Sequence, residues 1–194
     1  FRAKYALDQR PIIALLPGSR RQEISAMLPV MAQMADSFTN YQFVVAGAPS
    51  MEMSFYQQLI DESKIKIVTQ DTYSILSVAH AAMVTSGTAT LETALLKVPQ
   101  VVCYKGHWLS YEIAKRIIKL SYISLVNLIL DAPAVPELIQ SDFNTQSLTD
   151  NLDYILSAEG RSQQLKAYDQ LFEKLGPNGA SQRVAALIYG ASQQ

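Results

Sequence analysis

Short apolar runs alternate with longer segments of helical period through the first half of the chain, and this alternation constrains the fold more than any other feature. The runs are rich in branched side chains and cover residues 12–16, 43–46, 65–68, 82–85 and 100–104. Helical periodicity fills the intervals at residues 21–37, 51–60, 72–79 and 88–96. Continuous apolar runs are typical of parallel strands covered on both faces, and their alternation with helices indicates right-handed βαβ units.

Beyond Tyr104 the strand pattern fades and helical periodicity dominates. Two helices are expected at residues 146–157 and 161–175, and an earlier apolar stripe has helical spacing at Leu109, Ile113, Ile117 and Leu120. A last helix is expected to begin near Ser181, a good N-cap residue, and to end near Tyr189. The sequence therefore predicts one α/β domain over residues 1–194: a Rossmann-like, doubly wound parallel sheet with a helical C-terminal portion.

Composition excludes several classes of function. A formal net charge of −1 leaves no basic field for a nucleic-acid partner. Two histidines and one cysteine give no ligand spacing, so we expect no metal and no other cofactor. Cys103 lies in an apolar run, and we expect a buried, inert thiol. No segment approaches the ~20 apolar residues that a membrane-spanning helix needs.

Two junctions between a predicted strand and a predicted helix carry the most functional information, because ligands bind at the carboxyl ends of parallel strands. The first contains Gly18, Ser19 and Arg20, with Glu23 in the first helical turn. Glycine permits close backbone approach, Ser19 is a candidate helix cap, and an arginine beside free amide groups suits a phosphate oxygen. The alternative is an ordinary turn in which Arg20 is solvated.

The second junction places Ser86, Gly87 and Thr88 directly before a helix, where small side chains leave the first amides open to an anion. Glu92 follows one turn later, where a carboxylate could accept hydrogen bonds from paired sugar hydroxyls or simply favour the helix N-terminus. The segment is not a Walker sequence and lacks the Gly-x-Gly-x-x-Gly pattern.

Two further polar residues stand in apolar surroundings. Asn127 interrupts the run from Ser121 to Ile129, so its amide must find partners, either the backbone or a ligand. Glu137 follows Pro136, and we interpret it as an acidic residue at the start of a helix.

Several segments together are similar to lipid-A-disaccharide synthases. They are LLPGSRRQEI, TSGTATLETALLKVPQVVCYK, YEIAKRIIKLSYISLVNLIL, VPELIQ and LGPNGASQRVAALI, in that order, and they span nearly the whole chain. One departure is Val126, which stands where the family pattern usually has proline.

The resemblance implies the C-terminal half of a GT-B fold, in which two Rossmann-like domains face each other across a cleft. It implies an inverting, metal-free glycosyltransferase of Gram-negative bacteria. The donor is UDP-2,3-diacylglucosamine, the acceptor is 2,3-diacylglucosamine 1-phosphate, and the products are the β-1,6-linked lipid A precursor and UDP. Because the family's acidic base belongs to the N-terminal domain, which we expect to be missing here, we assign no catalytic residue and expect the chain alone to be inactive.

Carried over residue by residue, the resemblance implies that Arg20 and the turn at residues 86–88 contact the diphosphate or nucleotide. It implies that Glu92 accepts the ribose hydroxyls and that Asn127 contacts the donor. Acylated substrates further imply a cytoplasmic enzyme, peripheral at the inner membrane, and the basic and aromatic stretch 105–122 is a candidate for that contact.

Three other interpretations stay open on the residues alone. The chain could be the donor domain of another UDP-sugar enzyme of the same build, such as a peptidoglycan glycosyltransferase or a UDP-GlcNAc epimerase. It could also be a non-catalytic nucleotide-binding module, or a purely structural domain that binds no nucleotide.

Overall fold

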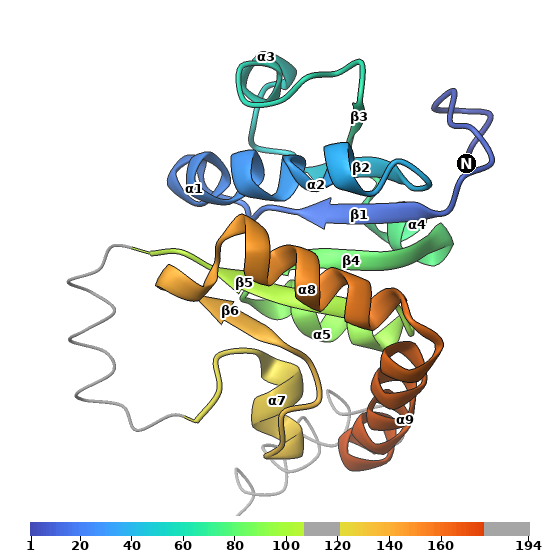
Figure 1. Ribbon diagram of the computed structural model, residues 1–194, viewed down its shortest axis with the longest axis vertical. Coiled ribbons are helices and arrows are strands. Elements are labelled where there is room, and N and C mark those ends of the chain that lie inside the picture. Colours follow the sequence, from blue (N-terminus) through green and yellow to red (C-terminus); the bar gives the residue numbers. More distant parts are fainter. Residues whose placement is uncertain (107–120, 177–194) are drawn as a thin grey trace, which may run out of the picture.

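A six-stranded, fully parallel sheet organises the computed structural model, which describes residues 1–106 and 121–176 (Figure 1). The strand order is β3-β2-β1-β4-β5-β6. The bounds are Ile12–Leu16 for β1, Gln42–Gly47 for β2, Ile65–Thr69 for β3, Ala79–Thr85 for β4, Gln100–Tyr104 for β5 and Glu137–Ile139 for β6. The five predicted strands are therefore confirmed within a few residues, and the sheet is doubly wound about β1 and β4.

Helices cover both faces of the sheet, and β1 shows why the strands read as continuous apolar runs. Ile13 and Leu15 pack into one core with the helices of the first face, while Ile12, Ala14 and Leu16 pack into a second core on the opposite face. Successive side chains of a strand point to opposite faces, so a strand covered on both sides must be apolar at every position. All five residues of β1 are buried.

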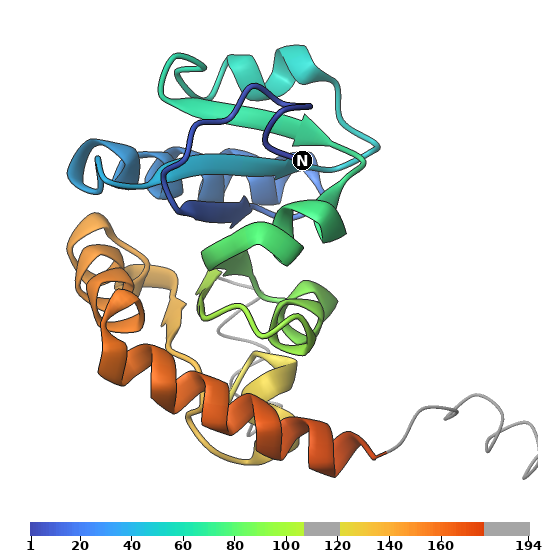
Figure 2. The same cartoon turned by 90° about the vertical axis from the view of Figure 1, so that its right-hand side faces the viewer.

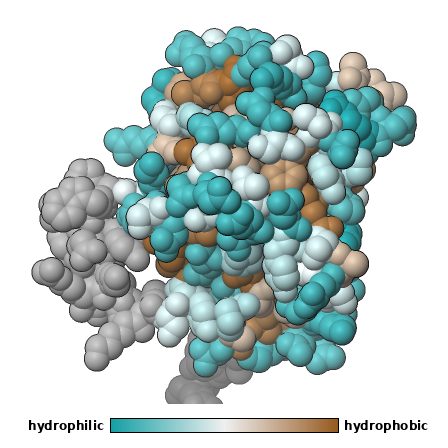
Figure 3. Space-filling view, viewed as in Figure 1, coloured by the Kyte–Doolittle hydropathy of each residue, from teal (hydrophilic) through white to brown (hydrophobic). Residues whose placement is uncertain are grey.

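The first face carries four of the helices that the structure describes: α1 (Arg21–Ala32), α2 (Met34–Ser37), α3 (Met53–Gln57) and α8 (Thr145–Leu156). The second face carries α4 (Thr72–Val78) and α5 (Thr88–Leu95), and α7 (Leu125–Leu130) packs beside α5. Helix α9 (Ala158–Leu175) runs past the β5–β6 side of the sheet (Figure 2). Polar side chains dominate the surface in the first view, and apolar colour is confined to patches between them (Figure 3).

Some predicted helices differ from the observed ones. The helix predicted at 21–37 is interrupted between α1 and α2, a few residues after Pro29, whose ring removes a backbone donor inside α1. The apolar run around Asn127 forms α7, because the Ser124 side chain caps it by accepting the amide of Asn127. The predicted helical stripe at 109–120 and the last predicted helix lie outside the described residues.

Strand β6 was not predicted, and the expectation that Glu137 begins a helix is wrong. Glu137 is the first residue of a three-residue strand that pairs with β5. Too short to show any alternation, β6 leaves no periodic signal in the sequence.

A buried polar group joins α9 to the start of β5. It consists of Gln100, Gln164 and Tyr168, and we call it the Gln100 cluster. The Gln164 amide accepts from the backbone N–H of Gln100 at 2.8 Å and donates to its carbonyl at 3.0 Å. The Tyr168 hydroxyl lies 2.8 Å from Oε1 of Gln164, and burial raises the pKa of Tyr168. Gln164 and Tyr168 are 2% and 0% exposed, so these bonds form away from water.

Across residues 1–106 and 121–176, no helix combines the length and the apolar character needed to cross a bilayer.

Candidate functional site

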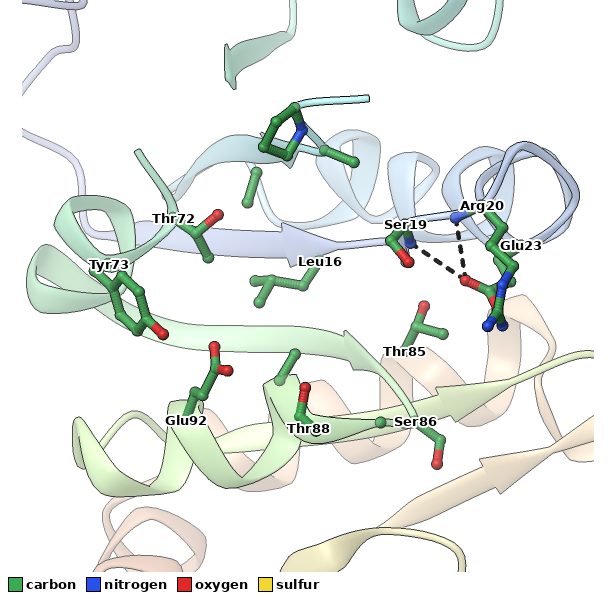
Figure 4. A pocket seen from close by; sticks show the side chains of 16 residues that line it. Leu16, Ser19, Arg20, Glu23, Thr72, Tyr73, Thr85, Ser86, Thr88 and Glu92 are labelled. Carbon is green, nitrogen blue, oxygen red and sulfur yellow. Dashed lines mark hydrogen bonds and ion pairs between the residues drawn. The ribbon is translucent and has the colours of Figure 1, made fainter. Parts of the chain in front are cut away.

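A cavity of about 410 Å³ opens at the carboxyl ends of β1, β2 and β4 (Figure 4). It lies where the strand order reverses, because the chain leaves β1 toward β2 on one side and later returns to pair β4 on the other. Such a switch point is where open α/β sheets bind their ligands. Every predicted site residue except Asn127 lines it: Gly18, Ser19, Arg20, Ser86, Gly87, Thr88 and Glu92.

The first wall of the cavity is the turn from β1 into α1. Gly18 has φ of 107°, and a Cβ there would lie 2.8 Å from a carboxylate oxygen of Glu23, so the turn requires glycine. That carboxylate accepts the amides of Ser19 and Arg20 at 3.2 and 3.3 Å and pairs with the Arg20 guanidinium at 2.8 Å. Ser19 was expected to cap this helix; Arg20 holds the N-cap position instead, and Glu23 bonds the amides. The start of α1 is thus already occupied by an internal anion.

The Arg20–Glu23 pair lies at the surface. The Arg20 side chain is 81% exposed and that of Glu23 is 31% exposed. Exposed ion pairs contribute little free energy, about 0–1 kcal/mol, so exchange of Glu23 for another anion costs little. Arg20 can therefore turn to a ligand in the cavity.

The second wall is the turn from β4 into α5. Gly87 is the N-cap with φ of 156°, and no side chain caps the helix. The Ser86 hydroxyl donates to the carbonyl of Ile123 at 3.0 Å, and its amide donates to the carbonyl of Cys103 at 3.0 Å. Ser86 therefore anchors the turn, and its hydroxyl points away from the cavity (Figure 4). In contrast to α1, the first turn of α5 presents uncapped amides to an anion.

Glu92 lies at the end of the cavity away from Arg20, beside Thr72 and Tyr73 (Figure 4). It follows Thr88 by four residues, so the helical rise places the two about 6 Å apart along α5. Thr72 and Tyr73 begin α4, after β3, and were not among the predicted site residues. The available signal was an aromatic residue in the first turn of the helix predicted at residues 72–79, soon after a predicted strand; in the structure Tyr73 is 63% exposed.

Thr85, the last residue of β4, is a further lining residue that was not among the predicted site residues. Thr85 is only 8% exposed, and its hydroxyl oxygen has no hydrogen-bond partner among the described residues. Figure 4 shows it between the Ser19–Arg20 turn and the Ser86–Thr88 turn.

Asn127 lies outside this cavity, in a buried polar group that we call the Asn127 cluster. Its amide nitrogen donates to the carbonyl of Val135 and to Glu137, both at 2.8 Å, and its oxygen accepts the amide of Val135 at 2.9 Å. The Glu137 carboxylate also accepts the amides of Ile123 and Ser124 at 2.9 Å. Of the two alternatives for Asn127, the structure shows bonding within the chain, and both amide N–H groups are used.

The structure describes the side chains that bear on two expectations from composition, the inert thiol of Cys103 and the metal ligands. Cys103 is fully buried, and burial raises the pKa of its thiol, in agreement with the predicted inert thiol. Within residues 1–106 and 121–176, no three His, Cys, Asp or Glu side chains gather in a way that could hold a metal ion. The candidate stretch for membrane contact lies largely outside these residues.

Comparison with known proteins identifies the family. The model of the lipid-A-disaccharide synthetase family matches residues 2–188. This chain belongs to that family. A lipid-A-disaccharide synthase from Coxiella burnetii is 35% identical over 192 residues, which make up 96% of this chain and 51% of that protein. One from Geobacter sulfurreducens is 34% identical over 194 residues, covering 96% and 50%. The chain thus spans about half the length of the lipid-A-disaccharide synthases it matches.

Solved structures agree with the fold expected for a lipid-A-disaccharide synthase half. The Staphylococcus aureus MnaA structure with UDP superposes with a TM-score of 0.66 at 13% identity, covering 99% of this chain and 47% of that one. The calicheamicin glycosyltransferase CalG4 gives 0.62 at 16% identity, covering 94% and 44%. In each case this chain matches somewhat less than half of the larger protein. These likenesses confirm the Rossmann-like half of a GT-B fold.

Proposed function

We propose that this chain is the donor-binding half of a lipid-A-disaccharide synthase and that the cavity between β1 and β4 holds the UDP part of UDP-2,3-diacylglucosamine. One observation carries the proposal: in a member of this family, a single cavity at the switch point gathers both glycine turns, Arg20 and Glu92. The cationic and amide-rich end suits a diphosphate, and the carboxylate end suits the ribose hydroxyls.

The reaction that this site would serve is a hexosyl transfer with inversion. A hydroxyl oxygen of 2,3-diacylglucosamine 1-phosphate bonds to the anomeric carbon of the donor, while the bond to the diphosphate breaks and its electron pair leaves on UDP. The hydroxyl proton passes to an acidic base that we expect from the N-terminal half. Arg20 and the amides of α5 would stabilise the charge that develops on UDP, a role that needs no metal.

Because both substrates are acylated, we further propose that the whole enzyme works peripherally at the cytoplasmic face of the inner membrane. A buried hydrocarbon chain favours a lipid surface by about 0.8 kcal/mol per CH₂ group, so the substrates stay in the bilayer and the protein comes to them.

Calorimetric titration with UDP tests the donor site, with ADP and GDP as competing nucleotides. We expect saturable binding selective for UDP, weakened by about 1–3 kcal/mol in Glu92→Ala and in Arg20→Ala because each loses charged hydrogen bonds. Glu159→Ala serves as the matched control, since Glu159 is exposed on α9 and outside the cavity. Absence of binding by folded protein would contradict a preformed donor site, and equal affinity for the three nucleotides would favour a generic nucleotide-binding module.

A second titration separates this proposal from other UDP-sugar enzymes of the same build. A lipid-A-disaccharide synthase should prefer UDP-2,3-diacylglucosamine over UDP-N-acetylglucosamine once the N-terminal half is present. The opposite preference would favour a peptidoglycan glycosyltransferase or an epimerase.

A further inference from the structure

Four buried side-chain atoms of the described residues have no hydrogen-bond partner, in Gln42, Thr85, Gln100 and Gln140, and of these residues only Thr85 lines the cavity between β1 and β4. Other buried threonines of the same region use their hydroxyls: Thr90 donates to the carbonyl of Gly87 at 2.8 Å, and Thr93 donates to that of Ala89 at 2.7 Å. Thr85 is more than nine-tenths buried, lines the cavity and has no partner among the described residues. A buried hydroxyl without a partner destabilises the folded protein, so its presence calls for a compensating role.

The surroundings of Thr85 indicate which group of a ligand it would meet. It lies between the two turns that form the cationic end of the cavity (Figure 4). At the start of α1, Glu23 already bonds the amides of Ser19 and Arg20. At the start of α5, directly after Thr85 in sequence, no side chain caps the helix. An anion entering the cavity therefore finds its open amides on the α5 side, next to Thr85.

We infer that the Thr85 hydroxyl is a ligand-binding group that donates a hydrogen bond to a phosphate oxygen of the bound nucleoside diphosphate. The inference rests on the proposed function and adds a residue to it. It also makes the α5 turn, rather than the start of α1, the primary diphosphate site, with Arg20 contributing once it leaves Glu23. The hydroxyl is satisfied only in the complex, so its lack of a partner in the free protein is the cost of a prepared site.

Thr85→Val tests this inference, because valine keeps the shape and removes only the hydroxyl. We expect UDP to bind about tenfold more weakly, as for the loss of one hydrogen bond to a charged group. We expect the free protein to become more stable, with Tm raised by about 2–4 °C, because an unpartnered buried group is removed. Thr85→Ser, which restores the hydroxyl, should recover most of the affinity.

Thr93→Val is the matched control, since Thr93 is also buried but its hydroxyl is bonded within α5 and lies outside the cavity. It should lower Tm and leave the UDP dissociation constant unchanged. A rise in Tm for Thr85→Val and a fall for Thr93→Val would distinguish a hydroxyl that bonds only a ligand from one that bonds within the protein.

The three possible contrary outcomes distinguish failure of the Thr85 inference from failure of the proposed donor site. If the wild-type chain and Thr85→Val bind UDP equally, the Thr85 inference is wrong and the donor site stands. If Thr85→Val lowers Tm, the hydroxyl has a partner in the free protein and the inference is again overturned. If the folded wild-type chain binds no UDP, the proposed donor site fails and the Thr85 inference fails with it.

Discussion

The Gln100 cluster and the cavity between β1 and β4 use similar polar side chains in opposite ways. In the Gln100 cluster, the amide nitrogen of Gln100 and the polar groups of Gln164 and Tyr168 bond one another and the backbone in a region closed to water, although Oε1 of Gln100 has no partner among the described residues. In the cavity, Thr85 has no partner among the described residues, and Arg20 holds only an exposed ion pair. Polar groups that bond one another stabilise the fold, whereas an unpartnered group that lines a cavity, as Thr85 does, is available to a ligand.

Breaking the Gln100 cluster should have the largest effect on stability. Gln164→Leu leaves the buried N–H and carbonyl of Gln100 without their partners, and we expect the free energy of unfolding to fall by about 3 kcal/mol. Denaturant unfolding measures the change, and UDP affinity of the folded protein should stay as in the wild type. Gln163→Leu, at the exposed neighbouring position, should change stability by less than about 0.5 kcal/mol. A similar small change in Gln164→Leu would show that the cluster is not structural.

Loosening the first wall of the cavity should have a smaller effect, and on binding rather than folding. Glu23→Gln removes the negative charge that competes with the ligand for Arg20 and the amides of Ser19 and Arg20. We expect UDP to bind about threefold more tightly at low salt, with the gain shrinking as screening increases. Titrations at two ionic strengths measure it. Weaker binding would mean that Glu23 orients Arg20 toward the ligand instead of competing with it.

A polar contact at the surface should have the smallest effect, visible only in acid. Asp71 precedes the cavity residues Thr72 and Tyr73, and its pKa is lowered to about 2 by hydrogen bonds from Ser74 and then from Tyr5 and Lys4. A lowered pKa stabilises the fold fully above the ordinary value of 3.8, and this contribution is lost as the pH falls toward 2. Unfolding midpoints of the wild type and Asp71→Asn should therefore converge between pH 4 and about pH 2. Parallel curves would exclude a role for the Asp71 carboxylate.

The sequence predicts the parts of this molecule that follow from local pattern. Five strands were found because a strand covered on both faces is apolar at each position, and the two cavity turns were found because glycine and small hydroxyl residues follow those strands. Strand β6 was not predicted, because three residues are too few to show a periodic pattern. The role of Glu137 was missed for the same reason. Thr72 and Tyr73 were not predicted as site residues, because only the pairing of β1 with β2 and β4 brings the start of α4 to the same cavity.

Two residues show why side-chain roles are harder to predict than elements. Thr85 ends one apolar run and Asn127 interrupts another, and both are buried, yet one lacks a partner among the described residues and the other bonds Val135 and Glu137. The difference depends on whether the chain returns to supply a carbonyl or carboxylate. No pattern within either segment carries that information.

The pairing of β1 with β4 also determines when the cavity can form during folding. The two walls of the cavity are contributed by strands that the whole of β2 and β3 separates along the chain, and they meet only when β4 docks beside β1. Parallel pairing over such a sequence separation is slow, because the loop must close before any contact rewards it. Nucleotide binding should therefore appear late during refolding, after most helical structure has formed. A nucleotide would then act as a selective trap for correctly assembled chains.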